Sequence, residues 1–285
     1  MEKLRIAIQK SGRLSEQSLG IIKEAGIKLT NGKRDLLAQS ASFPVEILYL
    51  RDDDIPQYVA DNVADIGFVG EDVYLEKGKE LDIALRLGFS KCRLSLAIPK
   101  SEEYQGIDWF NGKKIATSFP NILAGSLKDR GISAEIHEIS GSVEIAPGIG
   151  LADGICDIVS SGSTLVSNRL KEVEVLLKSE AILVANPDLS EGKKKILMEL
   201  VFRLKSVLAS KDNKYILLNA PNANIDKICS ILPGMKSPTV LPLAEEGWSS
   251  LHSVVNERKF WEVIGQLKEA GAEGILVIPI EKMIL

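Results

Sequence analysis

The sequence is poor in the residues that most often mark secreted or metal-binding proteins. Its 285 residues include three cysteines and two histidines: Cys92, Cys156, Cys229, His137 and His252. The cysteines are far apart and form no CxxC pair, which argues against both a disulfide framework and a zinc site. Neither histidine lies in a sequence setting typical of a metal ligand or a catalytic triad. We therefore expect all five to be structural.

The chain also lacks a strong net charge and a long apolar run. A net charge of -4 gives no field strong enough for a nucleic acid partner. No apolar run reaches the about 18 residues of a membrane span. The first residues, MEKLRIAIQKSGR, carry charges where an export signal would be apolar. We therefore expect a cytoplasmic protein that binds neither nucleic acids nor membranes.

What the chain does contain is an alternation of short apolar strands and amphipathic helices. The first strand, 4–8, precedes a helix that Ser15 would cap, and the strand 45–50 precedes a helix that Asp54 would cap. This alternation predicts a parallel sheet covered on both faces.

A second α/β unit follows the strand at 92–99. Its expected strands are 114–117, 134–139 and 157–160, with helices that start near Asn121, Glu144 and Ser163. We expect the strand 181–185 to return to the first unit. The sequence thus predicts an α/β clamshell, with residues 1–90 and 181–211 in lobe I, residues 91–180 in lobe II, and a ligand cleft at the strand ends.

The pattern changes after a short linker near residue 212. Strands at 215–218, 239–243, 251–255 and 274–279 and helices at 225–232 and 260–270 are arranged in the order βαββαβ. This order is typical of a ferredoxin-like domain, here residues 212–285. Such domains often bind amino acids in regulated enzymes, an expectation that rests on fold-level analogy.

Residues 157–164, DIVSSGST, predict a strand, a turn of small residues and the start of a helix. Free backbone N–H groups at such a turn can bind an anion, and Gly162 permits close approach of a phosphate. The hydroxyl groups that could add hydrogen bonds belong to Ser160, Ser161, Ser163 and Thr164. One interpretation of this segment is therefore a binding site for a phosphomonoester. The alternative is a polar turn before a capped helix, with no ligand.

Charged residues surround this loop in the predicted cleft. Glu144 and Asp157 could accept hydrogen bonds from the paired hydroxyls of a sugar, or they could act as the acid–base pair of a glycosidase. Either residue could instead cap a helix or be solvated, and their spacing in the sequence does not distinguish these roles. Cations follow strand ends, where they would hold phosphates or remain solvated; they are Lys10, Arg13, Arg51 and Arg93.

Three successive aspartates, residues 52–54, form the acidic run of the sequence. Carboxylates suit a hard cation such as Mg²⁺, but alternation along an extended run would point neighbouring side chains to opposite sides. We therefore leave the metal ligands unassigned.

Several of these segments resemble those of ATP phosphoribosyltransferases. The resemblance is carried by residues 141–147 (GSVEIAP) and 157–165 (DIVSSGSTL), and by KSGRLS at 10–15, RDDDIP at 51–56, CRLS at 92–95 and KIATS at 114–118. In the tail, SPT at 237–239, PLA at 242–244 and PIEKM at 279–283 resemble the regulatory domain of the long form. Ser161 stands where the family often has threonine, and the hydroxyl is kept.

The resemblance implies a periplasmic-binding-protein-like catalytic region and a C-terminal ACT-like domain. It implies that N1 of ATP attacks C1 of phosphoribosyl pyrophosphate, that pyrophosphate leaves with Mg²⁺, and that the product starts histidine biosynthesis. Residues 160–164 would hold the 5-phosphate, and Glu144 and Asp157 the ribose hydroxyls. The cations Lys10, Arg13, Arg51 and Arg93 would face nucleotide phosphates or pyrophosphate.

The resemblance also implies feedback inhibition by histidine, bound in the tail near Met235, Ser237 and Thr239. A homo-oligomer, built from dimers into a hexamer, and no separate regulatory subunit are expected. Two other classes share parts of the predicted architecture. A solute-binding receptor would need an export signal, and a transcription regulator would need a DNA-binding segment; the sequence shows neither pattern.

Overall fold

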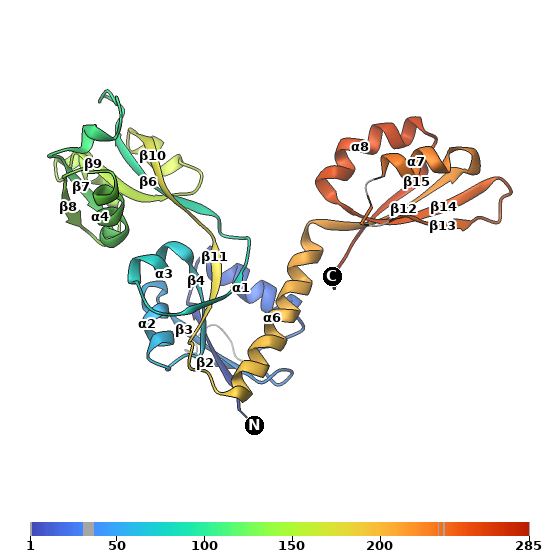
Figure 1. Cartoon of the computed structure of the whole chain (residues 1–285), viewed down its shortest axis with the longest axis horizontal. Helices are drawn as coiled ribbons and strands as arrows, with labels where there is room; N and C mark the ends of the chain where they lie inside the picture. Colours follow the sequence, from blue (N-terminus) through green and yellow to red (C-terminus); the bar gives the residue numbers. More distant parts are fainter. Residues whose placement is uncertain (1, 31–36, 233, 236, 285) are drawn as a thin grey trace. The chain divides into compact units, whose positions relative to one another are not determined.

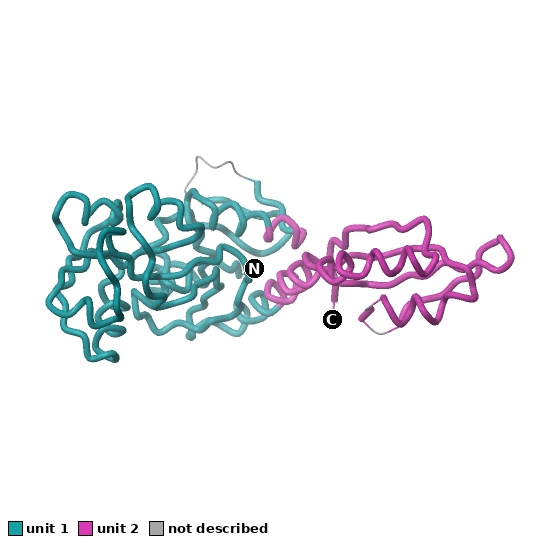
Figure 2. The backbone as a smooth tube through the Cα atoms, turned by 90° about the horizontal axis from the view of Figure 1, so that it is seen from above, with its two compact units in different colours: residues 1–20, 27–198 teal, residues 21–26, 199–285 magenta. Residues whose placement is uncertain are grey.

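The structure is a computed structural model that describes residues 2–30, 37–232, 234–235 and 237–284. The chain divides into two compact units (Figure 2). The first contains residues 1–20 and 27–198, and the second residues 21–26 and 199–285. Among the described residues, no helix is both long and apolar enough to cross a membrane.

A six-stranded sheet forms lobe I of the first unit, in the order β2-β3-β1-β4-β11-β5 (Figure 1). Its strands are β1 (Leu4–Gln9), β2 (Leu37–Gln39), β3 (Val45–Leu50), β4 (Ile66–Gly70), β5 (Asp82–Arg86) and β11 (Ala181–Ala185). Strands β3, β1 and β4 are parallel, whereas β2 and β11 are antiparallel to their neighbours. The helices of this part are α1 (Arg13–Glu24), α2 (Ile55–Ala60) and α3 (Glu71–Lys77).

A five-stranded sheet forms lobe II, in the order β10-β6-β9-β7-β8. Its strands are β6 (Cys92–Pro99), β7 (Lys114–Thr117), β8 (Glu135–Glu138), β9 (Gly154–Val159) and β10 (Leu170–Ser179). One face packs against α4 (Pro120–Asp129) around buried Phe110 and Leu123, and the other against the segments around Val143 and Leu165. Two passes of the chain join the lobes, because β5 continues into β6 and β10 continues into β11.

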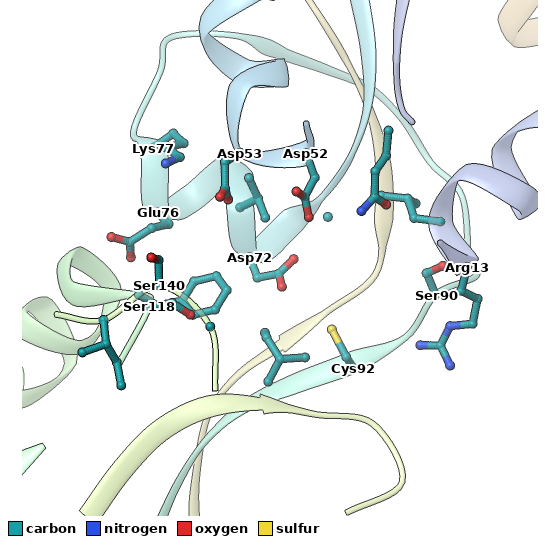
Figure 3. Close-up of a pocket in the computed structure, with 18 of the residues that line it drawn as sticks. Arg13, Asp52, Asp53, Asp72, Glu76, Lys77, Ser90, Cys92, Ser118 and Ser140 are labelled. Carbon is teal, nitrogen blue, oxygen red and sulfur yellow. The ribbon is translucent and has the colours of Figure 1, made fainter. Parts of the chain in front are cut away.

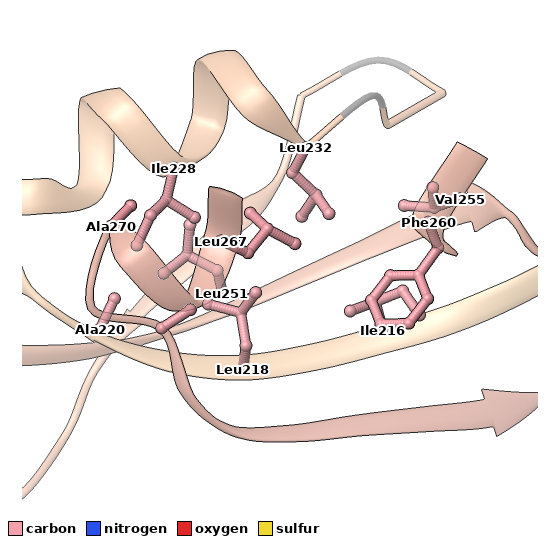
Figure 4. Packing of buried hydrophobic residues seen from close by; sticks show 11 residues of the cluster. Ile216, Leu218, Ala220, Ile228, Leu232, Leu251, Val255, Phe260, Leu267 and Ala270 are labelled. Atoms are coloured by element: carbon pink, nitrogen blue, oxygen red, sulfur yellow. The ribbon is translucent and has the colours of Figure 1, made fainter. Parts of the chain in front are cut away.

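The second unit ends in a four-stranded sheet in the order β13-β14-β12-β15. Helix α6 (Glu191–Lys211) leads into its strands β12 (Asn213–Pro221), β13 (Thr239–Pro242), β14 (Trp248–Asn256) and β15 (Glu273–Pro279). Helices α7 (Ile225–Ile231) and α8 (Glu257–Glu269) cover one face of it around Ile216, Leu251 and Phe260 (Figure 4). The element order is the predicted βαββαβ, so the ferredoxin-like fold is confirmed.

Several local predictions were wrong, each for a physical reason. Neither large sheet is wholly parallel, because β11 returns to lobe I against β4 and β6 runs against β9. The sequence prediction missed β2 and also β10, whose side-chain alternation is broken by two irregularities in its pairing with β6. The segment at Glu144 is a single 3-10 turn, Val143–Ile145.

Both predicted helix caps were also wrong. Helix α1 begins at Arg13, its first turn closes on the carbonyl of Gly12, and Ser15 is buried inside the helix. Asp54 occupies the position before α2, but its backbone is already helical and its side chain makes no capping hydrogen bond.

Candidate functional site

A cavity of about 630 Å³ lies within the first unit (Figure 3). Its lining residues closely follow the carboxyl ends of strands from both sheets: Arg13 after β1, Asp52 and Asp53 after β3, Asp72 after β4, Ser118 and Phe119 after β7, and Ile139 and Ser140 after β8. Strands of one direction in a sheet end at one edge, so side chains that are far apart in sequence meet there. The predicted cleft position is therefore the one observed.

One wall of the cavity is acidic. Asp52, Asp53, Asp72 and Glu76 all line it, and Asp72 and Glu76 are both only 7% exposed. Burial raises the pKa of Asp72, while the Ser179 hydroxyl, which donates to its Oδ1 at 2.8 Å, opposes the shift. Carboxylates in this wall can accept hydrogen bonds from a neutral donor or contact a cation.

The expectation that neighbouring aspartates point to opposite sides was wrong. Residues Asp52–Asp54 form a 3-10 turn instead of an extended run, and both Asp52 and Asp53 reach the cavity. Asp72 and Glu76 were not among the predicted site residues. The available signal was their spacing of four residues directly after the apolar run that ends at Gly70, which places both on one face of α3.

Arg13 connects the cavity to the small-residue loop. It lines the cavity, and its Nη1 and Nη2 atoms both lie 3.4 Å from the hydroxyl oxygen of Ser160. Among the described residues it is the one predicted site residue that lines the cavity. A guanidinium at this point can contact an anion bound to the loop and a second anion in the cavity.

The loop 160–164 follows β9 as predicted. Gly162 has φ +83, in the left-handed region that favours glycine. The hydroxyl oxygens of Ser161 and Ser163 are 3.0 Å apart, and all four hydroxyl-bearing residues of the loop are exposed. The loop therefore exposes its hydroxyl-bearing residues to solvent. Its backbone at Gly162 has a conformation that only glycine adopts readily.

Glu144 and Asp157 lie within electrostatic reach of each other. Asp157 is on β9, and burial together with the charge of Glu144 raises its pKa to about 6, against the backbone N–H of Ile158, which donates to it at 2.7 Å. Its neighbour Ile158 lines the cavity, so Asp157 belongs to the other face of the strand. Neither carboxylate belongs to the described lining of the cavity, and Asp157 precedes the loop on the same stretch of chain.

Arg93 is engaged within the protein. Its guanidinium forms a forked ion pair with Glu172, and its Nη1 donates to the backbone carbonyl of Ser160 at 3.1 Å. The glutamate also accepts a hydrogen bond from Ser95. In this arrangement Arg93 fixes the start of the loop.

Lys10 and Arg51 are brought together by the strand register. Gln9 pairs with Leu50 in the parallel β1–β3 ladder, and the backbone N–H of Lys10 donates to the carbonyl of Leu50 at 2.8 Å. Both side chains are exposed, and neither belongs to the cavity lining of the described chain. The ends of β1 and β3 therefore meet as predicted, but the side chains of Lys10 and Arg51 do not line the described cavity.

A second cavity, of about 390 Å³, lies in the ferredoxin-like domain. All three predicted regulatory residues line it: Met235, Ser237 and Thr239. Tyr215 and His252 also line it, and the Tyr215 hydroxyl lies 2.7 Å from Nδ1 of His252. The cavity thus combines hydroxyl groups, an imidazole and apolar surface at the scale of a small polar molecule.

The fold and the first cavity define a class of protein: a two-lobed α/β protein of the periplasmic-binding-protein type that carries a ferredoxin-like domain. Comparisons with known proteins show to which family within this class the chain belongs. The family described as ATP phosphoribosyltransferase matches residues 51–206, and the one described as HisG, C-terminal domain, matches residues 210–282.

Curated relatives named ATP phosphoribosyltransferase match along nearly the whole chain. Those of Bacteroides thetaiotaomicron and Cytophaga hutchinsonii are 61% and 62% identical, over 99% of this chain and 100% and 98% of their own. A solved structure described as the ATP phosphoribosyl transferase (HisG:HisZ) complex from Thermotoga maritima has a TM-score of 0.64 and 31% identity, over 72% of this chain and 98% of that one. The chain belongs to the ATP phosphoribosyltransferase family, in its long form with a C-terminal domain. It is therefore a pentosyltransferase of histidine biosynthesis.

The raised pKa of Asp157 predicts a pH-dependent stability. Because the folded-state pKa, about 6, lies above the ordinary value, Asp157 contributes stability at low pH that is lost as pH rises through about 6. Asp157→Asn removes this dependence, so its free energy of unfolding relative to the parent should rise by about 1–3 kcal/mol between pH 4 and pH 7. Denaturant titrations across that range measure the difference. Asp129→Asn, at an exposed carboxylate, should show no such trend, and a parallel course for all three proteins would contradict the prediction.

Proposed function

We propose that this enzyme joins N1 of the ATP adenine to C1 of the ribose in phosphoribosyl pyrophosphate. The C1–N1 bond forms as the bond from C1 to the pyrophosphate oxygen breaks. The observation that best supports this chemistry is the combination of a hydroxyl-rich loop, the interacting carboxylates Glu144 and Asp157, and Arg13, which contacts the loop and lines the cavity.

The residues divide into groups by chemistry. Residues 160–164 offer backbone N–H and hydroxyl donors to the 5-phosphate, and Glu144 and Asp157 offer acceptors to the ribose hydroxyls. Arg13 would stabilise the departing pyrophosphate, and the cavity would take the adenine nucleotide. Such an enzyme needs no covalent intermediate, because orientation and charge stabilisation at an oxocarbenium-like centre account for the rate.

Arg51, Lys10 and Arg93 have different places in this proposal. The exposed side chains of Lys10 and Arg51 follow neighbouring strand ends and would add positive charge for the polyphosphate of an arriving substrate. Arg93, already paired with Glu172, would act on the 5-phosphate through the backbone of Ser160.

We also propose that Mg²⁺ accompanies the pyrophosphate group. Among the described residues, no group of three His, Cys, Asp or Glu side chains is arranged to hold a metal ion. Mg²⁺ commonly uses only one or two carboxylates and otherwise binds substrate phosphates and water, and Asp52 and Asp53 in the cavity wall fit that donor set. When bound, the ion would neutralise charge on the leaving group.

The ferredoxin-like domain would bind histidine and lower activity. Its cavity is lined by Met235, Ser237 and Thr239, with hydroxyls suited to the charged ends of an amino acid. Inhibition requires that histidine bind a less active state more tightly than the active one. Because residues 210–282 match the family's C-terminal domain, we propose that the enzyme requires no separate regulatory subunit. We also propose that it is a cytoplasmic homo-oligomer.

The reaction itself can be tested with a matched nucleotide. Incubation with ATP, phosphoribosyl pyrophosphate and Mg²⁺ should release one pyrophosphate per ATP consumed and give a product substituted at N1, as nuclear magnetic resonance would show. The 1-deaza analogue of ATP lacks the attacking nitrogen and should release none. Pyrophosphate release without any nucleotide would favour the alternative hypothesis, in which Glu144 and Asp157 act as a hydrolytic acid–base pair.

The loop assignment predicts the effect of removing one hydroxyl. Thr164→Ala should raise the KM for phosphoribosyl pyrophosphate, because a hydrogen bond to a charged group contributes about 1.5–3 kcal/mol. Ser167→Ala is the matched control, since that hydroxyl bonds back to the carbonyl of Ser163 within the same short helix. Initial-rate kinetics with varied sugar substrate decide the matter, and an unchanged KM in Thr164→Ala would remove this residue from the site.

The regulatory assignment predicts a separation of activity from inhibition. Thr239→Trp should fill the second cavity, so the full-length enzyme should stay active while histidine no longer inhibits it. Leu241→Trp provides the control, because Leu241 lies on the same strand and face but outside the cavity. Inhibition curves for the three proteins measure the effect. Parent-like inhibition of Thr239→Trp would show that histidine binds elsewhere.

A further inference from the structure

Glu76 forms a contact between the two lobes of the first unit. It belongs to α3 of lobe I, yet its Oε1 and Oε2 accept hydrogen bonds from the backbone N–H groups of Asn121 and Ile122 in α4 of lobe II, at 2.9 and 3.0 Å. The Asn121 side chain returns a hydrogen bond to the backbone carbonyl of Glu76 at 3.1 Å. The glutamate side chain is thus bound at both oxygens and buried.

This contact supplies what α4 lacks locally. The first N–H groups of a helix have no partner within the helix, and a preceding polar side chain usually accepts from them. In the described chain Phe119 occupies that position and offers no side-chain cap, and Pro120 follows it. A carboxylate from the other lobe therefore caps α4 and also suits the positive end of the helix dipole.

The capped end of α4 is also a wall of the cavity. Ser118 and Phe119, directly before α4, line the cavity together with Glu76. Figure 3 shows Ser118 close to Glu76. Phe119 packs against the hydrophobic cluster of lobe I and against that of lobe II. The same short segment therefore joins the lobes by an apolar contact and a charged cap.

We infer that Glu76 is a positioning residue, which caps α4 across the lobes and so holds Ser118 and Phe119 where the cavity binds its nucleotide. The inference rests on the proposed function in taking ATP as the molecule bound in this cavity. Without the cap the lobes would spend less time in the arrangement that binds ATP, and apparent affinity falls with that fraction. Saturating ATP would restore the arrangement, so KM should change more than kcat.

Glu76→Gln tests this role with little change in shape. The amide keeps one acceptor but loses the charge and the second acceptor, so the KM for ATP should rise about tenfold, with kcat within about twofold of the parent. Glu80→Gln, the same change at an exposed residue next to α3, should leave both constants unchanged. Glu76→Asp keeps the charge on a shorter side chain, and its KM should lie between those of the parent and Glu76→Gln.

Amide hydrogen exchange separates positioning from general instability. In Glu76→Gln the amides of Asn121 and Ile122 should exchange faster, whereas those of β6 and β9 should keep their parent rates. Faster exchange throughout lobe II would mean that the glutamate only stabilises the fold, and the inference would be wrong.

A second cavity variant separates this inference from the proposed function. Ser118→Trp should obstruct the cavity and raise the KM for ATP if ATP binds there. A raised KM in Ser118→Trp with a parent-like KM in Glu76→Gln would overturn the positioning role alone. Parent-like values in both variants would overturn the placement of ATP in this cavity and the inference with it.

Discussion

Convergence of strand ends is the constraint on which the rest of the catalytic region depends. Parallel pairing of β3, β1 and β4 brings three chain segments to one edge of lobe I, and parallel pairing of β8, β7 and β9 does the same in lobe II. Residues directly after strand ends in both lobes line one cavity, so their side chains reach a shared space. The backbone pairing alone therefore keeps these positions together, whichever side chains they carry.

Charge is distributed unevenly around that space. Four carboxylates form one wall of the cavity, whereas the loop beyond Arg13 is built from hydroxyls and backbone N–H groups. Bare phosphates would be repelled by these carboxylates and attracted to the loop, to Arg13 and to Lys77, an exposed cation that also lines the cavity. We therefore expect anionic groups to contact the loop, Arg13 or Lys77, and neutral or cation-bound groups to contact the carboxylates. The raised pKa of Asp157 has a separate, local cause, because burial removes water from its carboxylate and the charge of Glu144 acts on it.

Local patterns predicted much of this arrangement. Strand ends followed by small or charged residues indicated the loop 160–164, Arg13 and the clamshell, and the alternation after residue 212 indicated the ferredoxin-like domain. The sequence could not show that Arg93 is already paired with Glu172, because that contact crosses from β6 to β10 and β10 itself was missed. The backbone form of residues 52–54 was also hidden, since three aspartates suit an extended run and a 3-10 turn equally well.

The return of β11 to lobe I has a consequence for how this chain can fold during synthesis. β11 lies between β4 and β5, and within the described sheet β5 pairs with β11 alone. As the chain leaves the ribosome, β5 emerges with no strand to pair with, and β4 keeps an open edge. Lobe I cannot complete its sheet until residue 185 has been made, whereas every strand of lobe II is available by residue 179. The inserted lobe can thus fold before the lobe that encloses it in sequence, and closure of lobe I over this long separation should be the slower step.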